Sequence, residues 1–302
     1  MKKFVDICRM TQKEVKSYMT EYLASREYKV ENQTGFLYAK GDVPVLLVAH
    51  MDTVHTLKPS EIKEVNGKIS SPQGIGGDDR CGIFIIMNIL KNLKCSVVLC
   101  EDEEVGGVGA KIFAKSDFIN QLDVNYIIEF DRKNANDAVF YSCDNKDFTE
   151  FVTDTTGFKV AYGSFSDISI IAPAAKIAAV NLSCGYYNAH TTDEYVMYDE
   201  MMDVVQAAEV LIKTECDKFE YVARAYPSIY NYQPTTYVQS QQTGFKVRAT
   251  HDLDVEIEVI FMIEGEEDVG YGKGRTKAEA WLDFFEQYDE VCFAQIVDYS
   301  FA

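Results

Sequence analysis

The stretch Val45-Leu46-Leu47-Val48-Ala49 decides the fold class, and His50-Met51-Asp52 follows it directly. Five consecutive apolar residues without alternation are typical of a strand that is buried on both faces of a sheet. Similar apolar runs lie at 96–99, 126–128 and 177–182. Strands of this kind occur where helices cover both faces of a largely parallel sheet, so these runs predict the central layer of such a domain.

Segments with helical periodicity separate these apolar runs. At 11–25, Thr11 and Glu14 have the spacing of a capping box, and the apolar residues that follow recur at i, i+3, i+4 and i+7. The alternation of strands with helices predicts an α/β sandwich with a mixed, mostly parallel central sheet flanked by helices. Further helices are expected at 82–93, 108–115, 146–156, 166–172 and 199–215, and short strands near 27–30 and 35–39.

The composition of the chain changes after about residue 216. Residues 219–240 are rich in Tyr, Gln and Thr, 245–263 alternate like strands of a sheet, and 276–289 has the pattern of a helix. We therefore expect a large α/β domain over 1–216 and a small acidic α+β domain, ββα-like, over 217–302.

Net charge limits the classes of partner. The 302 residues include 29 Lys and Arg against 48 Asp and Glu, a formal charge of −19. Residues 255–285 resemble the end of a double-stranded-RNA-binding domain, but 215–302 hold seven basic against 17 acidic residues, a net charge of −10. Nucleic acids and anionic membranes are bound by clustered positive charge, so we expect neither as a partner.

The sequence also suggests a cellular compartment. It has no apolar run of the roughly 20 residues that span a membrane and no apolar stretch of a signal peptide at its start. Its eight cysteines are scattered, and none forms a Cys-x-x-Cys pair. We expect reduced thiols in a cytoplasmic protein.

Ionisable residues follow each buried strand. His50 and Asp52 come after 45–49, an acidic run over 101–104 comes after the next strand, and Asp131 and His190 come after the last two. The carboxyl ends of parallel strands meet at one edge of a sheet, where α/β folds bind ligands. A fifth segment, Gly76-Gly77-Asp78-Asp79-Arg80, lies at the entry of a predicted helix.

Carboxylates that converge on one edge repel one another unless a cation lies among them. Imidazole and carboxylate ligands suit Zn²⁺, Co²⁺ or Mn²⁺. Spacing alone does not separate Asp78 from Asp79, or Glu103 from Glu104, as the ligand.

In this order the motifs resemble those of the two-metal aminopeptidase superfamily, which includes bacterial leucyl aminopeptidases, peptidase T and carboxypeptidase G2-like enzymes. The resemblance spans roughly residues 10–215. The motifs that carry it are His50-x-Asp52-Thr53-Val54, Gly77-Asp78-Asp79-Arg80-x-Gly82, Glu103-Glu104-Val105-Gly106, Asp131 and His190-Thr191-Thr192-x-Glu194.

The resemblance implies two divalent metal ions per chain, zinc in the first place and cobalt or manganese as alternatives, with Asp78 bridging them. It implies that Asp52 orients His50 and that Glu103 is the general base for hydrolysis of an amide by metal-activated water. The implied metal ligands are His50, Asp78 and Asp131 for one ion and Asp78, Glu104 and His190 for the other. His55 lies close to the His50 motif and could face the cleft, but a position on the surface is at least as compatible with the sequence; His251 has no recognisable ligand neighbours, so neither is placed in the site.

The chain departs from the lidded members of this superfamily. Only the 58 residues 132–189 separate Asp131 from His190. This length suffices for strands and helices of the core, but a lid domain of about a hundred residues does not fit. We therefore expect a compact core without the lid.

The favoured function is that of a metal-dependent aminopeptidase that hydrolyses short peptides. An N-acyl amino acid deacylase or a carboxypeptidase is the first alternative, and it needs a positive group for a free carboxylate, such as Arg80, Arg132 or Lys133. A non-catalytic binding or scaffold protein is the alternative from another class. Tyrosines in the C-terminal segment, at 226, 230, 232 and 237, are compatible with a homo-oligomer interface.

Overall fold

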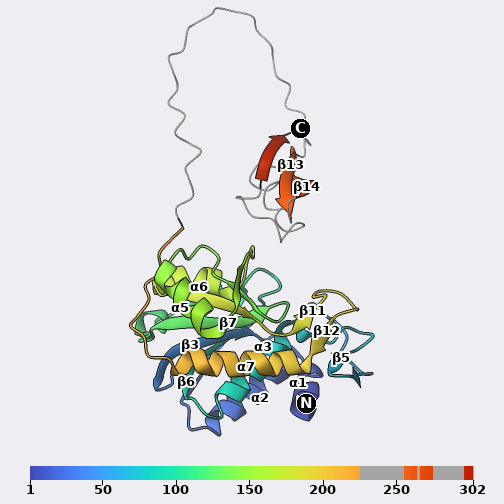
Figure 1. Cartoon of the computed structure of the whole chain (residues 1–302). Coiled ribbons are helices and arrows are strands. Elements are labelled where there is room, and N and C mark those ends of the chain that lie inside the picture. The colour runs from blue at the N-terminus through green and yellow to red at the C-terminus, as the bar shows by residue number, and fades with distance from the viewer. Residues whose placement is uncertain (225–254, 264–265, 275–295, 302) are drawn as a thin grey trace, which may run out of the picture. The chain divides into compact units, whose positions relative to one another are not determined.

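The structure is a computed structural model that describes residues 1–224 in full and the strands at 255–263, 266–274 and 296–301 by their backbone (Figure 1). The chain divides into two compact units, Met1–Ala223 and Arg224–Ala302, and each is described by itself. None of the helices described is long and apolar enough to cross a membrane.

An eight-stranded sheet forms the centre of the first unit, with the order β1-β2-β6-β3-β7-β10-β8-β9. The neighbours β6, β3, β7 and β10 run parallel, β8 and β9 are parallel, and the remaining pairs are antiparallel. The predicted mixed, mostly parallel sheet is thus confirmed. Its strands are β1 (Val30–Gln33), β2 (Phe36–Ala39), β3 (Val43–His50), β6 (Cys95–Cys100), β7 (Tyr126–Arg132), β8 (Asp137–Val139), β9 (Lys159–Ala161) and β10 (Ala179–Ser183).

Helices cover both faces of this sheet (Figure 1). Leu47 of β3 belongs to a core cluster with residues of α1, α2, α3, α5 and α7, whereas Leu46 and Val48 belong to a second cluster with α4 and α6. Because successive residues of a strand face opposite sides, an uninterrupted apolar run is needed to fill both cores. The helices are α1 (Lys2–Cys8), α2 (Gln12–Ala24), α3 (Gly77–Ile89), α4 (Val108–Phe113), α5 (Lys146–Thr156), α6 (Asp167–Ala175) and α7 (Tyr198–Lys213).

The starts of α2 and α3 differ in how far the local sequence determines where the helix begins. The Thr11–Glu14 capping box forms as predicted at the start of α2. By contrast, α3 begins at Gly77, not at residue 82, and its first turn is not helical at Asp78 or Asp79. The irregular turn follows Gly76, whose φ of +66° lies in the left-handed region.

A second, small sheet has the order β11-β12-β5-β4 and was not predicted. Its strands are only two or three residues long, so they carry no detectable periodicity. The sheet matters for the site because the loop that joins β11 to β12 contains His190. The strands are β4 (Lys63–Val65), β5 (Lys68–Ser70), β11 (Tyr186–Tyr187) and β12 (Tyr195–Met197), and a short 3-10 helix, η1, lies at Ile119–Gln121.

The segment between Asp131 and His190 contains no lid. It forms β8, α5, β9, α6, β10 and β11. Of these, β8, β9 and β10 belong to the central sheet, α5 and α6 pack on that sheet, and β11 belongs to the small sheet. The expectation of a compact core is confirmed.

In the second unit, β13 (Val255–Ile263) lies between β14 (Glu266–Gly274) and β15 (Ile296–Phe301) in an antiparallel sheet. The predicted helix at 276–289, the tyrosines at 226–237 and His251 lie outside the described residues.

Residues just after 216 pack on the first unit. The ring of Phe219 contacts those of Tyr126, Phe148 and Phe151, and Ala223 forms a β-bridge with Cys143. The first compact unit therefore extends to residue 223.

Candidate metal centre

The predicted site residues gather at the carboxyl ends of three neighbouring strands. His50 is the last residue of β3, Asp131 lies one residue before the end of β7, and Glu103 and Glu104 follow β6. Asp78 comes from the first turn of α3 and His190 from the β11–β12 loop. Segments far apart in sequence thus deliver ionisable groups to one edge, as sheet topology predicts.

Asp78 lies between the two histidines. Its Oδ1 is 2.9 Å from His50 Nε2, and its Oδ2 is 3.3 Å from His190 Nε2. On the outer sides, Asp131 Oδ1 is 3.4 Å from His50 Nε2 and Glu104 Oε2 is 3.2 Å from His190 Nε2. All five predicted ligands therefore form one continuous cluster, with one carboxylate oxygen of Asp78 turned toward each half.

Asp79, the neighbour that spacing could not separate from Asp78, has a different environment. Its side chain is fully buried, with Oδ2 accepting the His50 N–H at 3.1 Å and Oδ1 accepting the Gly82 N–H at 2.8 Å. Asp79 also lies near enough to His50 and Asp131 to share a cation with them. Because backbone amides occupy both of its oxygens, we interpret Asp79 as the residue that stabilises the turn.

Asp52 connects His50 to the acidic loop. Its Oδ1 lies 3.1 Å from His50 Nδ1, and its two oxygens accept the backbone N–H groups of Glu103 and Glu104 at 3.0 Å each. A carboxylate at Nδ1 keeps the proton on that nitrogen. The other ring nitrogen, Nε2, faces Asp78.

Two of the four acidic residues in the loop are structural. Glu101 Oε2 accepts hydrogen bonds from Lys16 Nζ at 2.7 Å and from the Gly35 N–H at 2.8 Å. Asp102 is tied to Gln12 by two hydrogen bonds of 2.9 and 3.0 Å. Helix α2, which carries Gln12 and Lys16, thereby holds the loop that presents Glu103 and Glu104.

Glu103 and Glu104 both lie near enough to His50 to share a cation with it, but their other surroundings differ. Glu104 groups with Asp78 and His190, and its buried Oε1 has no hydrogen-bond partner among the described residues. Burial raises the pKa of Glu103 to about 8, helped by the charges of Asp167, Asp78 and Glu104 and opposed by that of His50. A carboxyl group with a pKa near neutrality is suited to accept and return a proton.

The charges of the cluster fit a divalent cation. Hydrogen bonds to Asp78 and Glu104 raise the pKa of His190 to about 11, and burial together with the charge of Asp78 raises that of Asp131 well above its usual range. Without a cation, the cluster must hold extra protons to offset its negative charge. The imidazole nitrogens, the carboxylates and the unpartnered Glu104 oxygen are a donor set that Zn²⁺, Co²⁺ or Mn²⁺ accepts.

Arg80 is not accessible to a substrate, contrary to the expectation that it could bind a free carboxylate. It is 1% exposed, and its guanidinium donates to the carbonyl oxygens of Met51 and Asp52 at 2.8 and 3.0 Å and of Met10 at 3.1 Å. Arg80 therefore stabilises the backbone of the loop after β3.

Two polar residues around Asp131 were not predicted as part of the site. The Asn181 side chain accepts the Asp131 N–H at 2.9 Å, and the Ser166 hydroxyl lies 3.4 Å from Asp131 Oδ2. Both residues are fully buried. The sequence signal for Asn181 was that it is a polar residue within the otherwise apolar run 177–182.

His55 does not lie on the surface, which was one of the two positions considered for it. Its side chain is 10% exposed, and Nε2 lies 2.8 Å from Glu194 Oε2. Glu194 itself is fully buried. The pair lies beside the turn that carries Asp78, because Glu194 also accepts the N–H groups of Gly76 and Asp78.

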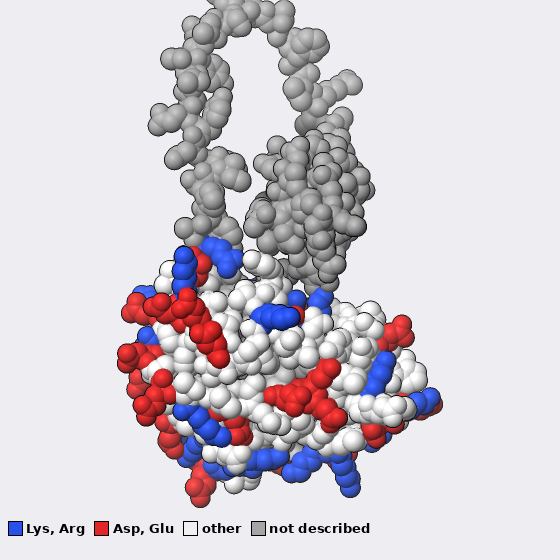
Figure 2. Space-filling model, in the orientation of Figure 1, with Lys and Arg blue, Asp and Glu red and all other residues white. Residues whose placement is uncertain are grey.

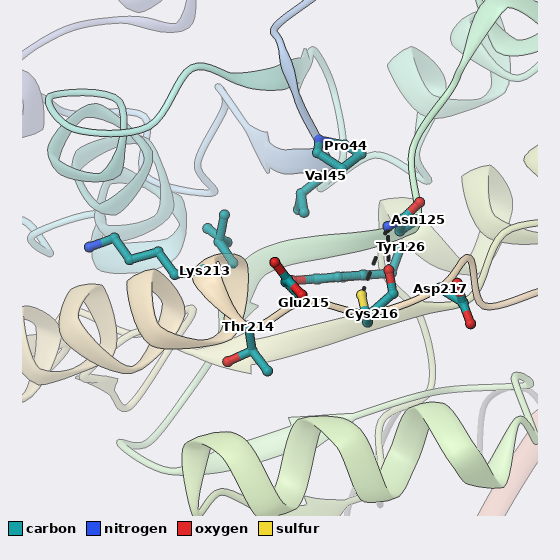
Figure 3. Close-up of a pocket in the computed structure, with 10 residues that line it drawn as sticks. Pro44, Val45, Asn125, Tyr126, Lys213, Thr214, Glu215, Cys216 and Asp217 are labelled. Carbon is teal, nitrogen blue, oxygen red and sulfur yellow. Dashed lines mark hydrogen bonds between the residues drawn. The ribbon is translucent and has the colours of Figure 1, made fainter.

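A surface pocket of about 550 Å³ lies at the other ends of the same strands (Figure 3). Val45 and Tyr126 line it near the starts of β3 and β7, together with the segment 213–217 that ends α7 and follows it. In the pocket, Asn125 Nδ2 donates to the Cys216 carbonyl at 2.9 Å (Figure 3). The pocket contains no group of metal ligands among the described residues, so we place the chemistry at the carboxyl ends of the strands.

Comparison with known proteins gives structural neighbours only. No family model and no curated protein matches the chain. Aminopeptidase PepT from Bacillus cereus ATCC 10987 is 15% identical, with 70% of this chain and 96% of that chain covered and a TM-score of 0.60. Aminopeptidase APDkam598 from the archaeon Desulfurococcus kamchatkensis is 14% identical over 70% of this chain and 94% of that chain, with a TM-score of 0.55.

A third neighbour has another activity in its name. The glutaminyl cyclase from Bacteroides thetaiotaomicron is 14% identical over 71% of this chain and 95% of that chain, with a TM-score of 0.52. At such identities the likeness extends to the fold alone, because one fold hosts several chemistries. The resemblance to the two-metal aminopeptidase superfamily is confirmed at the level of the fold: this chain has the architecture that these aminopeptidases share.

Proposed function

We propose that this protein is a metal-dependent exopeptidase, and specifically an aminopeptidase that acts on short peptides. The observation that carries the proposal is the position of Asp78, whose two oxygens face His50 and His190 separately. A carboxylate in this position is suited to bridge two ions. The fold shared with aminopeptidases supports the same conclusion.

In this proposal five residues would hold two divalent ions, zinc in the first place and cobalt or manganese as alternatives. When bound, such ions lower the pKa of a water molecule and polarise the carbonyl of the scissile amide. The ligands would be His50, Asp78 and Asp131 for one ion and Asp78, Glu104 and His190 for the other.

The protein's own residues would then move the proton and maintain the geometry. Glu103, with its pKa raised to about 8, would accept the proton of the attacking water and return it to the leaving amine. Asp52 would orient His50 through Nδ1 and fix the backbone of Glu103 and Glu104 through their N–H groups.

The alternatives have less support. A carboxypeptidase or N-acyl amino acid deacylase needs an exposed cation for the substrate's carboxylate. Of the three candidates, Arg80 is buried, Arg132 Nε lies 3.7 Å from Asp137, and Lys133 is half-buried. A scaffold protein has no need of a complete set of ligands and a base. We therefore favour hydrolysis of a peptide with a free amino terminus.

Three further expectations remain predictions. We expect a cytoplasmic location, with which the seven free cysteines of the described residues agree, six of them buried. Short peptides are the expected partner, and a homo-oligomer is compatible with the sequence. Nucleic acids and membranes are not expected as partners; on the face shown in Figure 2, basic side chains lie interspersed with acidic ones.

The experiment that tests the proposal is an assay of the full chain on peptides with free and with acetylated amino termini, each with added Zn²⁺, Co²⁺ or Mn²⁺. We expect release of the amino-terminal residue from the free peptides only. Hydrolysis of acetylated substrates alone would overturn the aminopeptidase assignment. Absence of hydrolysis with every metal would favour the scaffold alternative.

A further inference from the structure

Glu194 is a buried carboxylate to which the proposed chemistry gives no role. It follows His190 by four residues in the β11–β12 loop and has no exposed surface. Its Oε2 accepts hydrogen bonds from His55 Nε2 and from the Gly76 N–H, both at 2.8 Å, and its Oε1 accepts the Asp78 N–H at 3.0 Å. Both oxygens are therefore committed to the turn before α3 and to one histidine.

The turn from Gly76 to Asp79 needs an acceptor of this kind. Gly76 has φ +66°, Asp78 has φ −81° and ψ 104°, and Asp79 has φ −118° and ψ 45°, so the chain is not helical there. The first N–H groups of a helix have no partner within it, and an anion at this end is favourable. Glu194 satisfies two of these N–H groups from a loop more than 100 residues away.

Close packing holds the turn against this pair. A Cβ on Gly77 would lie 2.8 Å from Tyr186 Cβ and 3.3 Å from Glu194 Oε1, and a Cβ on Gly74 would lie 2.1 Å from the His55 ring. Glycines are therefore required where the turn passes the two side chains. The turn has little freedom to shift while Glu194 and His55 remain in place.

We propose that Glu194 and His55 are positioning residues that set the direction of the Asp78 carboxylate. The main-chain N–H of Asp78 is bound by Glu194 while its side chain lies between His50 and His190. His55 fixes Glu194, and the loop that carries Glu194 also carries His190. This inference rests on the proposed two-metal centre and extends it to two residues that ligate nothing.

The test is a Zn²⁺ titration of the metal-free full chain against a competing chelator, below the temperature at which any variant unfolds. We expect two ions for the wild type. Glu194→Ala should weaken binding by about 10- to 100-fold, the usual effect of losing a residue that orients metal ligands. His55→Leu, which removes only the donor to Glu194, should weaken it in the same direction by a smaller factor.

Two further variants separate positioning from general stability. His55→Gln keeps an N–H donor for Glu194 and should restore most of the affinity lost in His55→Leu. Glu200→Gln is the matched control, because Glu200 accepts the Tyr187 hydroxyl at 2.6 Å in the same region without contacting the proposed ligands. It should bind zinc like the wild type, even if its melting temperature falls.

The outcomes are distinguishable. Wild-type zinc affinity in both Glu194→Ala and His55→Leu would overturn the inference and leave the proposed function intact. So would equal losses in His55→Leu and His55→Gln. A wild-type chain that binds fewer than two ions would overturn the proposed metal centre, and the inference with it. If Glu194→Ala does not fold, the two His55 variants still decide.

Discussion

The two ends of the central strands differ in what they bring together. At the amino ends, a pocket of about 550 Å³ is lined by Val45, Tyr126 and the segment 213–217. At the carboxyl ends of the same strands, two histidines and a set of carboxylates lie within hydrogen-bond distance of one another. The pocket provides volume, whereas the other end provides buried charge in a defined arrangement.

The difference predicts that the chemistry lies at the carboxyl ends of the strands and not in the pocket. Burying several carboxylates close together is costly unless protons or cations compensate them, and such a cost is borne at functional sites. The pocket at the amino ends, where α7 ends beside the starts of β3 and β7, has no such cost. The comparison therefore predicts that substitutions at the two ends have very different consequences.

The largest effect is expected for Asp78→Ala. Its carboxylate lies between both halves of the proposed centre, so its loss should abolish peptide hydrolysis and reduce bound zinc from two ions to at most one. Elemental analysis and a peptidase assay measure both quantities. Glu215→Gln, in the pocket at the amino ends, is the matched control and should change neither. Equal effects at both ends would contradict the comparison.

The next effect is expected for Glu103→Gln, an isosteric change that removes the proposed base. Turnover should fall by about 10²- to 10⁴-fold, the usual contribution of general base catalysis. Both ions should still bind, because Glu103 is not a proposed ligand. Glu101→Gln in the same loop should retain most of the activity, since Glu101 only anchors the loop to Lys16 and Gly35. Loss of metal from Glu103→Gln would instead make it a ligand.

The sequence predicted the end of β3 well because a local pattern determines it. The run 45–49 must be apolar on both faces to fill two cores, and His50 ends it. The capping box at Thr11 and Glu14 is equally local and forms as predicted. Residues at the carboxyl ends of such strands could therefore be assigned to one site before their distances were known.

What the sequence did not predict depends on contacts between distant segments. Nothing near Glu194 indicates that it accepts the N–H groups of Gly76 and Asp78. Arg80 looks like a substrate-binding residue by its position, and only the fold shows that carbonyl oxygens enclose it. The different surroundings of Asp78 and Asp79 likewise follow from the irregular turn after Gly76, which local propensity does not predict.

A smaller effect is expected for Asp52→Asn. The amide can no longer act as an anion beside His50 Nδ1, and its nitrogen cannot accept an N–H from the Glu103–Glu104 backbone. We expect a loss of about 10- to 100-fold in metal affinity or turnover, as for other partners of metal-binding histidines. Asp217→Asn in the pocket at the amino ends is the control and should have no effect. A wild-type rate in Asp52→Asn would remove Asp52 from the site.

The smallest effect concerns the pH dependence of stability at the carboxyl ends. Asp167, at the start of α6, is fully buried with both oxygens unpartnered apart from a weak interaction with the Cys100 thiol, and burial raises its pKa to about 6. The folded state then binds a proton more tightly than the unfolded state does. The stability of the wild type should therefore fall as pH rises from about 4 to about 6.

Asp167→Asn, which does not ionise, should lack this part of the pH dependence. Thermal unfolding of the metal-free wild type and variant between pH 4 and 7 measures the difference in slope. Asp117→Asn, on the exposed surface, is the matched control and should keep the wild-type slope. A slope in Asp167→Asn as steep as that of the wild type would mean that this carboxyl is ionised in the folded protein. A buried cation or a donor must then neutralise it, and the charge compensation inferred for the metal-binding end would have to include Asp167.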